Sequence, residues 1–276
     1  MTDAKGLPAA LAERIAAAAP HGTVTIAYSG GLDSRFLAFS AKRLGYKVRL
    51  FHVRGPHIAP SETEEAIAGA RELGLEPEVI DLSPLSLPEL ASAGKLRCYV
   101  CKRGLFTELK RRAGGEPLCD GTNLTDLSVY RPGRKALIEL GIRSPLAEAK
   151  IGKPDIRRIG RELGFPRPDQ AARPCLLTRF PYGMLPDEKK LALIARAEDF
   201  IAADPFGRTL RFRLRCPDGV TPALHVEKSS LKSASEADVR ALCGRLRAAF
   251  GEPMQGLSFA IMEKLSGYYD RPEAKH

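Results

Sequence analysis

The sequence predicts an α/β protein with a doubly wound parallel sheet, followed by a smaller α+β domain. Residues 23–44 run from a buried apolar strand through a glycine-containing loop into a helix, and strands and helices continue to alternate after it. From residue 186 the pattern changes to helix, strand, strand, helix, strand. We therefore expect a nucleotide-binding domain at residues 1–185 and a smaller domain at residues 186–276.

The first strand and helix enclose an anion-binding loop, Ser29-Gly30-Gly31-Leu32-Asp33-Ser34. Gly30 and Gly31 carry no Cβ, so successive backbone N–H groups can point at phosphate oxygens beside the positive end of the helix. The loop is not a Walker A loop, because the Gly-Lys-Ser/Thr ending is absent. An ordinary glycine turn is the simpler alternative, and the strand-to-helix context favours the anion loop.

The remaining elements follow from hydrophobic periodicity and from helix-breaking residues. Helices are expected after residues 97–103 and 130–133, and also at residues 8–19, 61–73, 154–163, 187–202 and 235–250. Strands are expected at residues 47–53, 77–82, 117–119, 208–215, 222–228 and 257–262. In a doubly wound sheet, ligands bind beyond the carboxyl ends of the strands.

The charge of the chain favours acidic partners. There are 43 Lys and Arg residues against 33 Asp and Glu, which gives a formal charge of +10. Nucleotides or carboxylated substrates satisfy this bias as well as RNA does, and the basic residues are too scattered for a dedicated nucleic-acid tail. The sequence has neither an apolar stretch that could cross a bilayer nor a secretion signal, so we expect a cytoplasmic protein without a membrane partner.

The six cysteines are accordingly expected to be free, metal-bound or catalytic. Cys98 and Cys101 stand one helical turn apart, beside Lys102 and Arg103, which favour the thiolate form. The pair alone is compatible with a metal cluster, a zinc half-site or a redox pair. Cys175 lies among arginines and helix breakers, a setting typical of a reactive thiolate. The other three are expected to be packing or surface residues: Cys119, Cys216 and Cys243.

The phosphate loop and several later motifs together resemble one family. The loop is similar to the Ser-Gly-Gly-x-Asp-Ser signature of the PP-loop ATP pyrophosphatases, whose fold is adenine nucleotide alpha hydrolase-like. Five further motifs follow in order: Cys-Tyr-Val-Cys-Lys at 98–102, Asp-Gly-Thr-Asn at 120–123, Arg-Pro-Gly at 131–133, Ser-Pro-Leu at 144–146 and Pro-Cys-Leu-Leu-Thr-Arg-Phe-Pro-Tyr-Gly at 174–183. This set resembles the LarE family of ATP-dependent sulfur transferases over roughly residues 10–185.

The resemblance implies a reaction that uses ATP and magnesium. Residues 29–34 would hold the leaving pyrophosphate, with Ser34 donating to it and Asp33 helping to hold magnesium, while Gly121 and Thr122 would bind the nucleotide. The substrate would be a small nucleotide, a pyridinium mononucleotide on the way to the nickel-pincer cofactor. Its carboxylate would attack the α-phosphate of ATP, and sulfur would then displace AMP.

The resemblance also suggests where the sulfur is held. Some members of the family sacrifice the sulfur of a cysteine at the position of Cys175, whereas others bind a 4Fe-4S cluster. This chain has Cys98, Cys101 and Cys175, so we expect the cluster form, with one iron left for the sulfur to be transferred. The sulfur donor stays open. The alternative is a tRNA base thiolase of the same superfamily, against which the ordered motifs and the lack of paired zinc-binding modules both argue.

Substrate anions are expected to meet arginines of the second half of the chain. Arg179, Arg211 and Arg213 are the candidates, because guanidinium groups match the geometry of phosphate and carboxylate. Glu198 and Glu227 are candidates for the same pocket, although exposed positions would explain them equally well. We also expect a homo-oligomer.

Two positions depart from the family pattern. Asp126 alone remains of an acidic pair after residues 120–123, and Asp169-Gln170-Ala171 stand where the family has Asp-Lys-Pro. The C-terminal residues resemble the end of the family only loosely.

Overall fold

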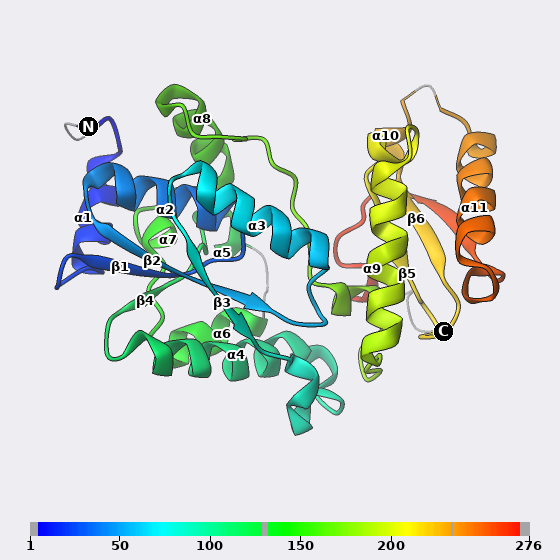
Figure 1. Ribbon diagram of the computed structural model, residues 1–276, viewed down its shortest axis with the longest axis horizontal. Coiled ribbons are helices and arrows are strands. Elements are labelled where there is room, and N and C mark those ends of the chain that lie inside the picture. The colour runs from blue at the N-terminus through cyan, green and yellow to red at the C-terminus, as the bar shows by residue number, and fades with distance from the viewer. Residues whose placement is uncertain (1–4, 129–131, 233, 271–276) are drawn as a thin grey trace. The chain divides into compact units, whose positions relative to one another are not determined.

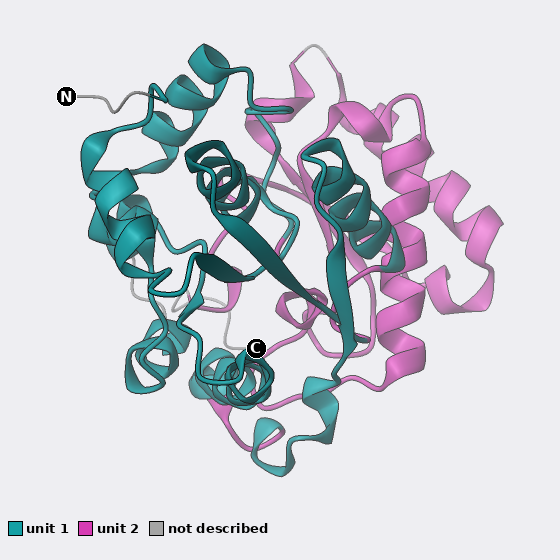
Figure 2. Ribbon diagram, turned by 60° about the vertical axis from the view of Figure 1, so that its left-hand side comes forward, with its two compact units in different colours: residues 1–55, 60–90, 95–173 teal, residues 56–59, 91–94, 174–276 magenta. Residues whose placement is uncertain are grey.

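A computed structural model describes residues 5–128, 132–232 and 234–270. The chain forms two compact units, coloured separately in Figure 2. Unit 1 comprises residues 1–55, 60–90 and 95–173, and unit 2 comprises residues 56–59, 91–94 and 174–276. The main division between the two units along the chain falls between Arg173 and Pro174. The domain boundary expected at residue 185 stays a prediction.

Unit 1 contains a four-stranded parallel sheet in the order β3-β2-β1-β4. Its strands are β1 (Thr23–Ala27), β2 (Lys47–Arg54), β3 (Pro77–Asp81) and β4 (Leu118–Cys119). The chain adds β2 and β3 on one side of β1 and then returns to place β4 on the other side. The order reverses at β1, and ligands of such sheets bind beyond the carboxyl ends of the strands that meet at this point.

Helices cover both faces of this sheet (Figure 1). Side chains alternate along a strand, so Leu50 and Phe51 of β2 enter separate hydrophobic cores. On the face of Leu50 lie α1 (Ala9–Ala17), α2 (Leu32–Leu44), α3 (Pro60–Glu72), α7 (Pro145–Glu148) and α8 (Lys153–Leu163). On the face of Phe51 lie α4 (Arg97–Ala113) and α6 (Pro132–Glu139). The doubly wound α/β prediction is confirmed.

Shorter elements complete unit 1. Helix α5 (Leu124–Leu127) follows β4, and three 3₁₀ turns lead from β3 to α4: η1 (Pro84–Ser86), η2 (Pro88–Leu90) and η3 (Gly94–Leu96). Helix α2 ends at Gly45, whose φ of 96° lies in the left-handed region that glycine adopts without strain. Within the described ranges, no helix is both long and apolar enough to cross a membrane.

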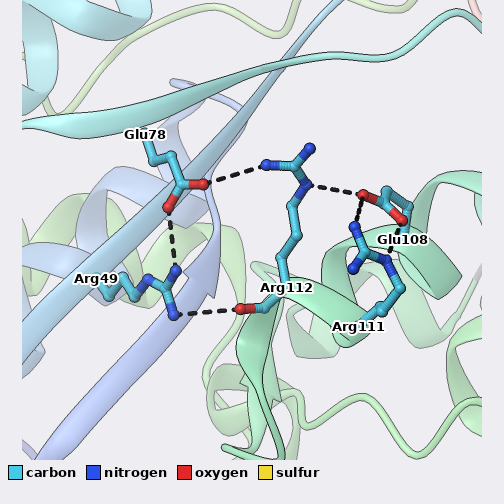
Figure 3. Close-up of polar contacts among 5 residues, drawn as sticks. All are labelled: Arg49, Glu78, Glu108, Arg111 and Arg112. Atoms are coloured by element: carbon cyan, nitrogen blue, oxygen red, sulfur yellow. Dashed lines mark hydrogen bonds and ion pairs between the residues drawn. The ribbon is translucent and has the colours of Figure 1, made fainter.

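The C-terminal end of α4 is held against the sheet (Figure 3). Glu78 of β3 accepts from Arg49 Nη2 at 3.1 Å and from Arg112 Nη1 at 3.4 Å, and Arg49 also donates to the Arg112 carbonyl at 3.3 Å. Arg49 is near the start of β2, so this end of α4 lies at the amino edge of the sheet. A crossover helix runs antiparallel to the strands that it connects. The first turn of α4, which contains Cys98 and Cys101, therefore lies at the carboxyl edge.

Unit 2 is built on a three-stranded sheet in the order β5-β6-β7. Strands β5 (Phe212–Arg215) and β6 (Ala223–Glu227) are antiparallel, and β7 (Ser258–Met262) is parallel to β6. The helices are α9 (Glu188–Ala203), α10 (Lys228–Leu231) and α11 (Glu236–Phe250). Four 3₁₀ turns complete the unit: η4 (Leu176–Arg179), η5 (Gly207–Thr209), η6 (Glu252–Met254) and η7 (Tyr268–Asp270). The predicted small α+β region is confirmed.

Candidate active site

The phosphate loop joins β1 to α2 in a defined backbone conformation. Gly30 has a φ of +74°, and a Cβ on it would lie 2.3 Å from the Cβ of Ala66 in α3, so glycine is required there. Gly31 is the N-cap of α2, and its N–H donates to Ser29 Oγ at 3.4 Å. Ser34 Oγ lies 3.2 Å from Ser29 Oγ and donates to the Gly31 carbonyl at 3.2 Å. The two hydroxyls and the helix N-terminus thus surround one spot at the carboxyl end of β1.

A second loop forms the other wall of this spot. Gly121 follows β4, and a Cβ on it would lie 2.8 Å from Ser34 N, so any larger residue would collide with the first turn of α2. Asp120 fixes this loop because its carboxylate accepts from Thr122 N at 3.2 Å, from Thr122 Oγ1 at 2.5 Å and from Ser144 Oγ at 2.6 Å. The structure therefore brings together the two predicted nucleotide-binding segments.

Lys153 completes this site and was missed by the sequence analysis. It is the first residue of α8, and its Nζ lies 3.8 Å from Asp33 Oδ2. Its backbone N–H donates to Thr125 Oγ1 at 3.0 Å, which fixes the start of the helix. The phosphate loop contains no lysine of its own, and Lys153 supplies a cation from 120 positions later in the chain. The signal that could have found it was its place directly before the predicted helix at residues 154–163.

The donor set around Asp33 suits magnesium. Mg²⁺ prefers oxygen ligands and is usually held by one or two carboxylates together with phosphates of the substrate. Asp33 offers a half-exposed carboxylate, and the Ser29 and Ser34 hydroxyls lie on the same loop. Throughout the part of the chain that the structure describes, no three or more His, Cys, Asp or Glu side chains are grouped to hold a metal ion by themselves.

Asp126, the remaining acid of the family pair, has a structural contact. It is buried, and its Oδ2 accepts from Asn123 Nδ2 at 2.8 Å and from Asn123 N at 3.4 Å. These bonds cap α5. Tyr130 and Arg131, which begin the next predicted motif, lie outside the described residues.

Cys98 and Cys101 lie in the first turn of α4, where the sequence analysis expected the helix only after residue 103. Nothing interrupts the helix there, because residues 97–103 include neither proline nor glycine. Cys98 is exposed and Cys101 half-buried, and neither forms a disulfide bond. The pair can therefore serve as metal or cluster ligands at the carboxyl edge of the unit 1 sheet.

The three remaining cysteines behave as packing residues. Cys119, Cys216 and Cys243 are buried free thiols. Burial raises the pKa of Cys119 to about 12 and that of Cys216 to about 11, and it also raises the pKa of Cys243. At neutral pH these three stay protonated and are poor nucleophiles.

Cys175 belongs to unit 2, in a tight turn before η4. Its carbonyl accepts from Thr178 N at 3.0 Å and from Thr178 Oγ1 at 2.7 Å, and its side chain is half-buried. Cys98 and Cys101 belong to unit 1. That the three thiolates meet at one cluster therefore stays a prediction.

Arg179 and Glu198 form a buried ion pair in unit 2. Arg179 Nε and Nη2 donate to the two carboxylate oxygens, each at 2.8 Å, and the side chains are 3% and 15% exposed. Arg179 Nη1 donates to Thr178 Oγ1 at 2.8 Å and to the Pro174 carbonyl at 3.1 Å. Glu198 also accepts from Leu214 N at 2.9 Å. The pair thus ties the Cys175 segment to α9 and β5, while its contact with substrate stays a prediction.

The remaining candidates lie on or beside β5 and β6. Arg211 is exposed and its Nη1 donates to Glu227 Oε1 at 3.0 Å, whereas half-buried Arg213 donates to the Phe212 carbonyl at 2.6 Å. Arg215, which the sequence analysis missed, is buried next to them and donates to His225 Nδ1 at 2.8 Å. Burial, followed by the charges of Arg179 and Arg213, lowers the pKa of Arg215 to about 10. The spacing of two residues along a strand, which places Arg213 and Arg215 on one face, was the signal for it.

Comparison with known proteins gives the family. No family model matches the chain. It is 39% identical over 180 residues to an uncharacterized protein of Synechocystis sp., covering 64% of this chain and 67% of that protein. It is 34% identical over 183 residues to an uncharacterized protein of Methanocaldococcus jannaschii, covering 64% and 69%.

A third relative has a named activity. The chain is 31% identical over 195 residues to pyridinium-3,5-bisthiocarboxylic acid mononucleotide synthase of Lactiplantibacillus plantarum, covering 69% of this chain and 70% of that enzyme. The chain belongs to the LarE family. The LarE resemblance drawn from the ordered motifs is confirmed at the level of the family.

Proposed function

We propose that this LarE family member is an ATP-dependent sulfur transferase of nickel-pincer cofactor synthesis. The observation that carries the proposal is the arrangement around Asp33, where the loop of residues 29–34, Gly121 and Lys153 meet at the carboxyl ends of β1 and β4. Such a spot suits the phosphates of a nucleotide, because N–H groups, hydroxyls and a lysine all face it. The printed name of the Lactiplantibacillus plantarum relative supports a pyridinium mononucleotide as the substrate.

In the proposed reaction, a carboxylate oxygen of the substrate attacks the α-phosphorus of ATP. The bond from this phosphorus to the bridging oxygen breaks, and pyrophosphate leaves with the electron pair. The Gly31 N–H, Ser34 and Lys153 stabilise the charge that develops on the leaving group. Magnesium held at Asp33 would neutralise phosphate charge when bound. A sulfur nucleophile then attacks the carbonyl carbon of the adenylate, and AMP leaves.

The cysteines are proposed to supply the sulfur. Cys98, Cys101 and Cys175 would hold a 4Fe-4S cluster, which when bound supplies an iron site that carries sulfide. In unit 1, Cys98 and Cys101 lie at the start of α4, with Lys102 and Arg103 next to them in the sequence. Arg179, Arg211, Arg213 and Arg215 of unit 2 are proposed to face the phosphate and carboxylate of the substrate, and Glu198 and Glu227 are proposed to line the same pocket.

The products of ATP test the reaction. Protein, MgATP and a pyridinium mononucleotide that carries carboxylates are mixed, and the nucleotides and phosphates are quantified over time. We expect AMP and pyrophosphate in equal amounts, and neither when the carboxylated substrate is omitted. ADP and phosphate as products would contradict the proposal, because they require attack at the γ-phosphorus.

A further inference from the structure

Gln170, which is not part of the phosphate loop, forms a hydrogen bond to the backbone of that loop. Its Nε2 donates to the Gly30 carbonyl at 3.1 Å, and its Oε1 accepts from Arg35 Nη1 at 2.9 Å. A guanidinium group can only donate hydrogen bonds, so the atom of the Gln170 amide that faces Arg35 must be the oxygen. The amide NH₂ of Gln170 is then left to face Gly30.

Arg35 is itself anchored in unit 1. It is fully buried, and its Nη2 donates to the Pro166 carbonyl at 2.9 Å and lies 3.6 Å from Glu72 Oε2. Its guanidinium also lies over the Phe165 ring, 5.0 Å from the centroid. These contacts fix the position of the guanidinium, and Arg35 directly follows Ser34 in α2. The support of Gln170 therefore comes from the same helix that ends the phosphate loop.

The hydrogen bond from Gln170 to the Gly30 carbonyl also fixes the direction of the Gly31 N–H. In a planar trans peptide, the carbonyl of Gly30 and the N–H of Gly31 point in opposite directions. With the carbonyl held by Gln170, the Gly31 N–H is turned to the other side, where it meets Ser29 Oγ at 3.4 Å in an exposed position. That bond is long, so a phosphate oxygen can replace the hydroxyl at little cost.

We propose that Gln170 is a positioning residue for the pyrophosphate portion of ATP. The inference rests on the proposed function, because it requires that the loop of residues 29–34 bind ATP. Without the amide donor, the peptide between Gly30 and Gly31 loses its hydrogen bond on the carbonyl side, and the Gly31 N–H is no longer aimed at the leaving group. The donor lies in the loop proposed for the pyrophosphate, so we expect contacts to the adenosine and the α-phosphate to be independent of it.

The test compares Gln170→Glu and Gln170→Ala with the wild-type protein. Glutamate has the shape of glutamine and keeps an oxygen for Arg35, but it places a second oxygen against the Gly30 carbonyl. We expect the affinities for MgATP and for pyrophosphate to fall about three- to tenfold in both variants, with the affinity for AMP unchanged. The melting temperature of Gln170→Glu should fall less than that of Gln170→Ala, because the carboxylate keeps the hydrogen bond to Arg35.

The neighbouring residue provides the control. Asp169 is exposed and pairs with Arg161 at the surface, so Asp169→Asn should leave all three affinities unchanged. Unchanged pyrophosphate affinity in both Gln170 variants would overturn the inference alone. An equal loss for all three ligands with a lower melting temperature would also overturn it, because that result indicates a merely structural role. Wild-type protein that binds neither ATP nor pyrophosphate would overturn the proposed function as well.

Discussion

The phosphate loop of unit 1 and the arginine group of unit 2 are both expected to meet anions, but they are built differently. In the loop, the Gly31 N–H makes a long, exposed bond of 3.4 Å to Ser29. In unit 2, buried Arg179 makes two bonds of 2.8 Å to the carboxylate of Glu198. A ligand can displace the first partner cheaply, whereas displacing the second leaves a buried carboxylate without its cation. Positive charge alone therefore does not identify an anion site, because the strength of the existing partner also matters.

The largest effect is expected at the loop. Replacing Asp33 by Asn should lower the rate of AMP formation by on the order of a hundredfold or more, because the charge that holds magnesium is lost where charge develops. The fold should survive, because Asp33 is half-exposed. Initial rates of AMP formation measure the loss of activity, and thermal unfolding tests whether the fold is intact.

Glu64→Gln, at an exposed position of α3, is the matched control for Asp33→Asn and should leave the rate unchanged. If Asp33→Asn kept the wild-type rate, the proposed role of this edge of the sheet would have to be abandoned.

A smaller effect, on stability, is expected in unit 2. Arg179→Ala should destabilise the protein by about 3–5 kcal/mol, because Glu198, which is only 15% exposed, keeps the Leu214 N–H as a donor but loses its cation. Arg211→Ala removes an exposed partner of Glu227 and should cost about 0–1 kcal/mol. Denaturant unfolding of both variants gives the comparison. Equal losses would show that the buried pair is no more important to the fold than the exposed one.

The smallest effect concerns the reactivity of the thiols. At pH 8, iodoacetamide should modify exposed Cys98 in the native protein and leave Cys119, Cys216 and Cys243 unmodified. Burial raises the pKa of these three thiols above the ordinary value, so they remain protonated at pH 8. Peptide mass mapping identifies which cysteines have been modified. Labelling of Cys119 as fast as that of Cys98 would contradict the separation of buried and reactive thiols.

Much of the fold could be predicted from the sequence, because hydrophobic periodicity and helix-breaking residues act locally. The start of the strand at Thr23 and the end of the helix at Leu44 were both predicted and are confirmed. The topology brings Gly121 against Ser34, as expected for segments that follow neighbouring parallel strands.

Contacts between distant side chains could not be predicted in the same way. The approach of Lys153 to Asp33 depends on how α8 packs, and the partner of Gln170 lies 140 positions earlier in the chain. Sequence patterns also do not show which basic side chain pairs with a given carboxylate. The ion pair of Arg179 with Glu198 is therefore seen only in the structure of unit 2. The sequence shows that these residues are polar, but it does not show which residues they contact.

The source of the sulfur is the central claim, and the number of sulfurs transferred per chain tests it most directly. Anaerobically reconstituted protein is given MgATP, the carboxylated mononucleotide and excess sulfide, and thiocarboxylate, bound iron and intact protein mass are measured together. We predict several sulfurs per chain, no loss of mass at Cys175, and loss of both iron and transfer when Cys98, Cys101 or Cys175 is replaced by Ala. Protein that binds no iron, transfers one sulfur and becomes lighter by one hydrogen sulfide at Cys175 would contradict it.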